Sequence, residues 1–161
     1  MIAKLIVVLL VGIALYIAVV GRERILEVVF GPMIVKSIDF PNLALGPNPN
    51  QFLVCPKGYC TSTPHLISPS FALSAQDLKK SWMAMVEVQP RIEKASVDDA
   101  ALQYDFIQRT EWVRYPDSIT VRFIPLGEAS STLAIYSRSH YGKSDFGVNE
   151  ARITSWLKFL K

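Results

Sequence analysis

The chain has 161 residues, of which 50% are apolar and 19% are charged, and its net charge is +3. This length allows one domain, and the apolar content excludes an intrinsically disordered chain. The small net charge argues against a nucleic-acid binder, and two cysteines are too few for a disulfide-dense scaffold or a four-cysteine zinc module.

The amino-terminal segment holds the excess of apolar residues. Lys4 is the only charged residue in Met1–Val20, and Leu5–Val20 is uninterruptedly apolar. A helix of about 20 residues is about 30 Å long, the thickness of a bilayer core. We therefore predict that residues 1–21 form a transmembrane anchor that contacts membrane lipids through Met1–Val20. A cleaved signal peptide is the alternative, and the lack of a small-x-small cleavage site favours the retained anchor.

The orientation of this anchor follows only weakly from charge. Lys4 lies on one side of the apolar run, and Arg22 and Arg24 lie on the other, so the positive-inside rule is nearly balanced. The very short amino-terminal tail favours an internal amino terminus. We expect a single-pass protein of the bacterial inner membrane with its domain on the periplasmic side.

Residues 22–73 are apolar and rich in proline. Lys36–Leu73 contains six of the ten prolines. Proline removes an amide donor and fixes φ, which disfavours helices and central strands. We predict an extended strap that lies on the domain.

Residues 74–161 show the periodicities of an α+β domain. Ser74 and Asp77 resemble a capping box, and Pro90 marks the end of the helix that follows. Period-2 patterns predict four strands, and the last element has helical spacing. The expected fold is a helix, a four-stranded antiparallel meander and a carboxy-terminal helix, with both helices on one sheet face. The four strands and the last helix are expected at Arg91–Val97, Ala101–Thr110, Ser118–Pro125, Ser131–Ser139 and Val148–Leu160.

The two cysteines, Cys55 and Cys60, bracket a turn-forming Pro-Lys-Gly-Tyr sequence. A tight turn brings two Cα atoms within the roughly 7 Å that a disulfide requires. We predict a disulfide if the domain faces an oxidising compartment. Free thiols and a zinc site completed by His65 are the alternatives, although three ligands fall short of a structural zinc set.

The densest polar cluster runs from the last predicted strand into the last helix. Its candidate binding residues are Ser137, Arg138, Ser139, His140, Gly142, Ser144, Asp145, Gly147, Asn149 and Arg152. One interpretation is a structural corner in which Asp145 caps the helix. The other is an anion site at the helix amino terminus, assisted by Arg138, Lys143 and Arg152.

Motifs of known enzymes are absent from the sequence. It contains no G-x-S-x-G, H-E-x-x-H, P-loop or G-x-G-x-x-G pattern. We expect a protein that is not an enzyme, without catalytic residues, cofactor or metal. A hydrolase or transferase that uses the Ser137–Asn149 corner is the weakest alternative.

The polar cluster resembles the DUF1499 family, a domain family of unknown function. The hallmark R-S-x-S-R-x-G-x-S-D-x-G-x-N-x-x-R matches at eight positions: Ser137, Ser139, Gly142, Ser144, Asp145, Gly147, Asn149 and Arg152. Asn48-Pro49-Asn50 and Tyr115-Pro116-Asp117 are similar to further family positions. Tyr136 and His140 stand where the family has arginines, and Cys60 is additional. The resemblance implies a small envelope or membrane-associated domain and no particular activity.

These features together give an expectation of function. We expect a membrane-anchored, non-catalytic envelope protein that docks on a membrane-protein complex as an accessory subunit. A lipid-binding envelope module is the alternative.

Overall fold

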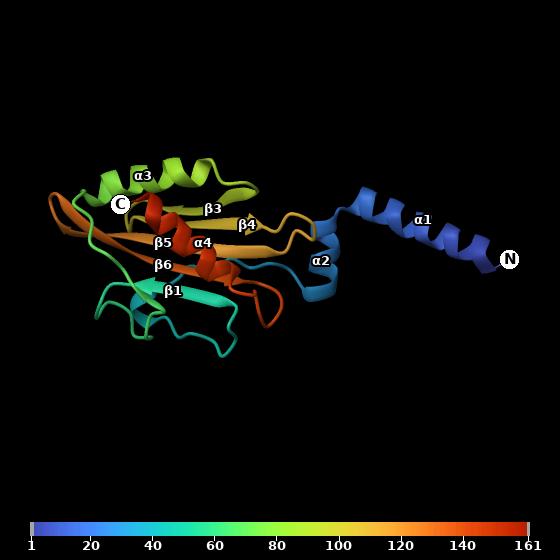
Figure 1. The fold of residues 1–161 in the computed structure, drawn as a ribbon, viewed down its shortest axis with the longest axis horizontal. Coiled ribbons are helices and arrows are strands. Elements are labelled where there is room, and N and C mark those ends of the chain that lie inside the picture. The colour runs from blue at the N-terminus through green and yellow to red at the C-terminus, as the bar shows by residue number, and fades with distance from the viewer. Residues whose placement is uncertain (1, 161) are drawn as a thin grey trace.

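The computed structural model describes residues 2–160. Met1, the first residue of the predicted anchor, and Lys161, the last residue of the predicted α+β domain, lie outside the described residues. Two helices come first, and an α+β domain follows (Figure 1). The elements in chain order are α1 (Ile2–Val20), α2 (Arg22–Phe30), the 3-10 helix η1 (Phe40–Asn42), β1 (Gln51–Cys55), β2 (Leu66–Ile67), α3 (Ala75–Glu87), β3 (Ile92–Asp98), β4 (Gln103–Arg109), β5 (Pro116–Gly127), β6 (Ser130–Ser139) and α4 (Val148–Phe159).

The strands form one six-stranded sheet in the order β2-β1-β6-β5-β4-β3. β3 to β6 make the predicted antiparallel meander, but the predicted total of four strands is wrong. β1 pairs antiparallel with β6, and β2 pairs parallel with β1, so the proline-rich segment supplies two strands. Pro49 and Pro56 flank β1 without entering it, and each of its residues therefore keeps its amide donor.

Both predicted helices of the domain are confirmed. The Ser74 hydroxyl accepts a hydrogen bond of 3.1 Å from the Asp77 amide at the start of α3. Apolar residues of α3 and α4 share one core with alternate residues of the strands, which places both helices on one sheet face as predicted. Trp82 and Trp156 meet edge to face at the centre of this core, with ring centroids 5.6 Å apart.

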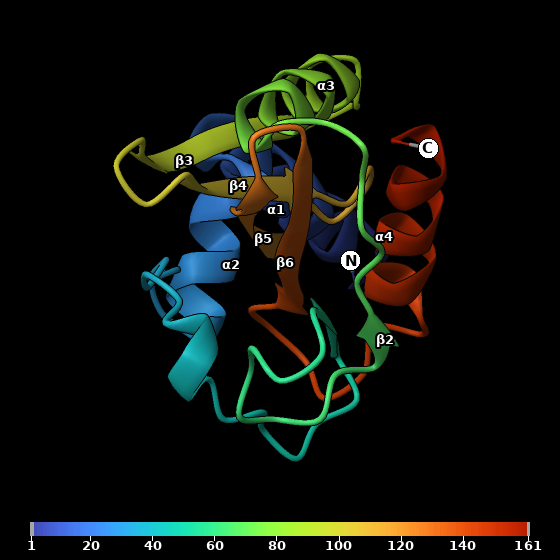
Figure 2. The ribbon, with the colours of Figure 1, turned by 90° about the vertical axis from the view of Figure 1, so that its left-hand side faces the viewer.

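The segment before β1 covers the opposite sheet face. Phe40 of η1 is fully buried there against Leu53, Cys55 and Tyr136. The chain before it also contacts the sheet, because the Gln103 side chain donates a hydrogen bond of 3.0 Å to the Ile38 carbonyl. Figure 2 shows α2 and α4 on opposite sides of the strands. This part of the proline-rich segment therefore lies against the sheet.

The helix α1 extends away from the domain (Figure 1). All its residues from Lys4 to Val19 are exposed. Within residues 2–160 no single helix is both long and apolar enough to count as a membrane span. Lys4–Val20 and Arg22–Phe30 satisfy the length and composition criteria only together, with a 97° bend between them. Gly21 provides that bend with φ at 84°, a conformation that glycine adopts without strain.

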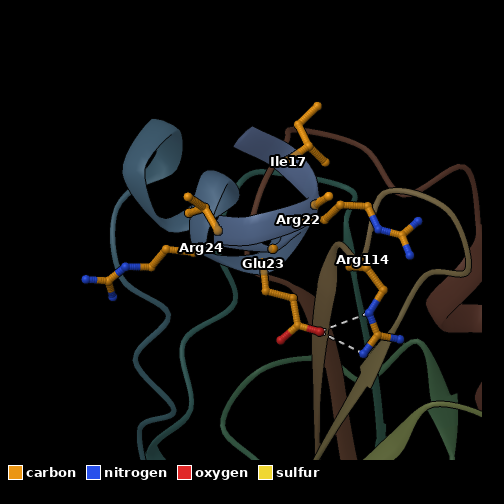
Figure 3. A pocket seen from close by; sticks show the side chains of 8 residues that line it. Ile17, Arg22, Glu23, Arg24 and Arg114 are labelled. Atoms are coloured by element: carbon orange, nitrogen blue, oxygen red, sulfur yellow. Dashed lines mark hydrogen bonds and ion pairs between the residues drawn. The ribbon is translucent and has the colours of Figure 1, made fainter. Parts of the chain in front are cut away.

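Charged contacts fix α2 to the domain. The Glu23 carboxylate accepts hydrogen bonds from Arg114 Nε at 2.9 Å and Nη2 at 2.7 Å (Figure 3). The same carboxylate lies 3.0 Å from Arg109 Nε. A wide hollow of about 630 Å³ lies between these groups and the end of α1. The Arg22 side chain, in turn, donates a hydrogen bond to the Trp112 carbonyl at 2.6 Å. The β4–β5 loop is therefore held beside the point where α1 leaves the domain.

The predicted disulfide is present between Cys55 and Cys60, whose Cα atoms lie 6.2 Å apart. It joins the end of β1 to the loop that leads to β2. Cys55 is fully buried, whereas Cys60 lies at the edge of the same apolar cluster. The bond therefore fixes the loop on the sheet rather than joining two layers of the fold.

We expect reduction of this disulfide to destabilise the domain without unfolding it. Because the closed loop is short, chain entropy predicts a loss of about 2 kcal/mol in the free energy of unfolding. Thermal unfolding with and without reductant measures the effect. The double variant Cys55→Ala/Cys60→Ala should unfold at one temperature under both conditions. Two alkylatable thiols in the native protein would contradict the bond.

Candidate functional site at the corner between β6 and α4

The corner comprises the end of β6 from Ser137, the turn of residues 140–147, and the start of α4 up to Arg152. Gly142 and Gly147 have φ values of 83° and 79°, which allow the chain to reverse within this short turn. The turn brings the end of β6 and the first turn of α4 together. Side chains from both elements then meet above the end of the sheet.

Asn149 is the centre of the corner and is 1% exposed. Its side-chain oxygen accepts hydrogen bonds from Ser137 Oγ at 2.5 Å and Arg152 Nη1 at 2.7 Å. Its amide nitrogen faces three acceptors: Asp145 Oδ2 at 2.7 Å, Ser139 Oγ at 3.3 Å and the Asn50 carbonyl at 3.3 Å. Donors on one side and acceptors on the other define the amide orientation.

A buried ion pair connects α4 to β5. Arg152 Nη2 lies 2.6 Å from Asp117 Oδ2, and the two side chains are 9% and 5% exposed. The other carboxylate oxygen of Asp117 accepts a hydrogen bond of 2.6 Å from Ser139 Oγ. These bonds satisfy both charges inside the protein, which is the condition for burying an ion pair without a large penalty.

Asn50 attaches the strand β1 to the same corner. Its side chain donates a hydrogen bond of 2.8 Å to the Gly142 carbonyl. Its own carbonyl accepts a hydrogen bond of 2.9 Å from the Ser139 amide. Asn50, Asp117 and Asn149 therefore bring three distant parts of the chain into one hydrogen-bonded network.

Asp145 caps α4 from two residues before its N-cap, Gly147. Its carboxylate accepts hydrogen bonds from the amides of Gly147 at 3.1 Å and Asn149 at 2.8 Å. Burial by itself would raise the pKa of Asp145, but the hydrogen bonds from Asn149 and Gly147 outweigh it and hold the pKa below its ordinary value. This is the capping role that the sequence predicted for Asp145.

Within residues 2–160, the side chains of Arg138 and His140 make no hydrogen bond to this network. Strand alternation directs Arg138 to the sheet face opposite Ser137, where its guanidinium lies 6.0 Å from the centre of the Tyr136 ring. Burial and the charge of Arg138 lower the pKa of His140, and its Nε2 is buried without a hydrogen-bond partner among residues 2–160. With Arg152 committed to Asp117, the corner does not assemble the anion site considered from the sequence.

A groove of about 370 Å³ opens beside the network. Its walls carry three hydroxyl side chains of Thr110, Ser139 and Ser144. They also carry the carboxylates of Asp117 and Asp145. Four aromatic rings complete the walls: Phe30, Tyr115, Tyr141 and Phe146. The groove thus combines residues of the hallmark with aromatic residues from α2 and from the loops.

Three of the aromatic rings form one wall of the groove. Phe30 stacks on Tyr141 with centroids 5.0 Å apart, and it meets Tyr115 edge to face at 6.1 Å. The Tyr141 hydroxyl donates a hydrogen bond of 2.9 Å to the Gly31 carbonyl. These contacts join the end of α2 to the corner, and the aromatic wall is therefore fixed in place.

The serine and histidine side chains of the corner do not form a hydrogen-bonded pair within residues 2–160. Ser137 Oγ is occupied by Asn149 and Arg152, and the His140 side chain makes no hydrogen bond to any serine in the described part of the chain. No group of three or more potential metal ligands occurs between residues 2 and 160.

Sequence reasoning identified five members of the network directly: Ser137, Ser139, Asp145, Asn149 and Arg152. It did not assign Asn50 or Asp117 to the site, although both lie in segments that resemble family positions. The aromatic wall gave no sequence signal, because Phe30 precedes the corner by more than one hundred residues.

Comparison with known protein families assigns most of the chain to one family. A family model described as "Protein of unknown function (DUF1499)" matches residues 44–160, which is well over half of the chain. The chain therefore belongs to the DUF1499 family. The matched region begins before β1 and so includes Asn50, Asp117 and the whole corner. No curated protein matches the chain.

We expect Asp145→Ala to lower the free energy of unfolding by about 0.5–2 kcal/mol, because α4 loses its cap. Lys143→Ala, in the same turn, should have no measurable effect.

The stabilisation by Asp145 should depend on pH. Because the pKa of Asp145 is lower in the folded state than in the unfolded state, the stabilisation is complete above the unfolded pKa and is lost as the pH falls through the folded pKa. Urea unfolding at neutral pH and near pH 2–3 tests this, and the difference between variant and wild type should shrink in acid.

We expect Arg152→Gln to cost about 3–5 kcal/mol, because it leaves the Asp117 carboxylate buried without its counter-charge. The exposed pair Lys80–Asp77, with side chains 75% and 52% exposed, provides a matched control. Lys80→Gln should cost less than about 1 kcal/mol. Equal costs for the two variants in chemical denaturation would contradict the structural role of the buried pair.

Proposed function

We propose that this protein is a membrane-anchored, non-catalytic envelope protein that binds a membrane component with the end of the domain from which α1 leaves. In this proposal, α1 is the anchor, and the domain lies on the periplasmic side of a bacterial inner membrane. The groove at the corner between β6 and α4 is the binding site.

The position of the groove carries the proposal. Phe30 of α2, Tyr115 of the β4–β5 loop and Tyr141 of the corner all line it, and Arg22 joins that loop to the start of α2. Figure 1 shows both loops and α2 at the end of the domain nearest α1. A ligand that occupies this groove lies next to the membrane if α1 is inserted.

Exposed apolar side chains at the same end also support a membrane-surface role. Trp112 is 77% exposed and Phe146 is 96% exposed. Tryptophan is enriched at membrane–water interfaces, where its ring lies at the level of the headgroups. The apolar residues of α1 are exposed on all sides of the helix, as expected for a helix in lipid.

Two occupants fit this end of the domain. An accessory subunit of a membrane-protein complex would use the exposed Trp112 and Phe146 as contact residues. A lipid-binding module would use the groove, whose aromatic and polar walls suit an amphipathic headgroup. The groove favours the lipid-binding function, because a protein contact by itself does not need a cavity of this size.

We expect the full chain to remain in the membrane fraction after alkaline carbonate extraction and to retain its amino-terminal segment. Val11→Arg/Leu15→Arg should release it, since each arginine at a helix centre costs about 2.5–3.5 kcal/mol on insertion scales. Val97→Arg, an equivalent change at an exposed residue of β3, is the control. Wild-type protein in the soluble fraction, or a mature amino terminus near Arg22, would contradict the anchor.

The occupant is identified by purifying the membrane-extracted protein in a mild detergent. A stoichiometric protein that is lost in Trp112→Ser would support the accessory-subunit role. A bound lipid that is lost in Tyr115→Ala would support the lipid-binding role.

A further inference from the structure

The groove that contains the aromatic wall is also lined by a carboxylate without an ion-pair partner among residues 2–160, that of Asp145. Asp145 is ionised at neutral pH, and its hydrogen-bond donors among residues 2–160 are the neutral amide groups of Gly147 and Asn149. Among the ion pairs of residues 2–160, none involves Asp145. Asp117 is neutralised by Arg152, and no lysine or arginine among residues 2–160 lines the groove. Asp145 therefore gives the groove a net negative charge.

Arginines near the groove do not change this balance. Arg109 and Arg114 lie behind Tyr141 on the α2 side, and both are paired with Glu23. Arg109 is also paired with Glu93 at 3.1 Å. Arg109 and Arg114 are thus already compensated by carboxylates, and Asp145 is left as the carboxylate without an ion-pair partner among the described residues that line the groove.

From the combination of aromatic rings and a carboxylate we propose that the groove binds a quaternary ammonium group. Such groups have no N–H donor and are recognised by the faces of aromatic rings and by a nearby negative charge. An inorganic cation would require several oxygen ligands, whereas Phe30, Tyr115 and Tyr141 supply rings. A purely apolar ligand would gain nothing from Asp145.

The inference rests on the proposed function, because it names the ligand chemistry of the same groove. A trimethylammonium group can come from a free solute or from a choline lipid headgroup. Both sources share the recognition chemistry. The location beside α1 makes the headgroup accessible, and the experiment below distinguishes the two sources.

The first measurement uses the full chain in a maltoside detergent, which has no ammonium group. Choline and its uncharged carbon analogue 3,3-dimethyl-1-butanol are compared by calorimetry and by ligand-observed NMR of their methyl groups. We expect choline to bind about tenfold more tightly, since a desolvated cation–π contact contributes roughly this factor or more. Equal affinities, or no binding of either compound, would overturn the proposal.

Substitutions at the aromatic wall separate ring recognition from apolar burial. Tyr115→Phe retains the ring and should bind choline like the wild type, whereas Tyr115→Leu retains only the apolar volume and should bind about fivefold or more weakly. Asp145→Asn keeps an acceptor at the helix cap and should also weaken binding. Lys143→Gln, a charge change outside the groove, should not weaken it. Thermal unfolding verifies that each variant is folded, and wild-type affinity in folded Tyr115→Leu would overturn the proposal.

Reconstitution in bilayer nanodiscs identifies the source. If the headgroup is the ligand, added choline should bind in phosphatidylglycerol discs but not in phosphatidylcholine discs, where lipid occupies the groove. Equal binding in both supports a free solute. Choline binding by a chain that carbonate releases from membranes would refute the anchor while supporting the ammonium site. Membrane retention without choline binding would refute the ammonium site alone.

Discussion

The ion pair between Arg152 and Asp117 is the interaction on which the corner depends. Two charges removed from water require complete hydrogen bonding, and that requirement fixes the positions of Ser137, Ser139 and Asn149 around them. Asn149 then orients Asp145, whose carboxylate caps the amino terminus of α4. The chain can satisfy this network only when β5, β6 and α4 are in their final positions. The pair therefore links the correct assembly of the domain to the shape of the groove.

Sequence periodicity predicted the meander and both domain helices because their apolar residues repeat with the spacing of strands and helices. It failed for β1 and β2, since the proline content of a long segment obscured the proline-free Gln51–Cys55. The candidate site was predicted as a linear cluster, and strand alternation divided it between two faces of the sheet. Asn50 and Asp117 join the network through strand pairing, which no local pattern reveals. Phe30 joins through the packing of α2, which is equally nonlocal.

The two faces of the sheet serve different purposes. The face that carries α3 and α4 holds the large apolar core, and this core stabilises the domain. The opposite face holds η1 and the smaller cluster around Phe40, which attach the segment before β1 to the sheet. The helix α2 is attached instead by the ion pairs of Glu23 with Arg109 and Arg114. The groove is lined both by Phe30 of α2 and by Asp145 at the start of α4. A movement of α2 would therefore alter the aromatic wall without disturbing the main core.

The two edge strands of the sheet, β2 and β3, have features that limit pairing with strands of other molecules. An open strand edge offers unpaired amides and carbonyls to strands of other molecules. Here β2 ends after two residues and Pro69 follows closely, so little of that edge can pair. At the other edge, β3 exposes Glu93 and Lys94 and has a register shift before Ser96. Both edges thus oppose strand addition, which allows a concentrated population of the domain to remain free of intermolecular sheets.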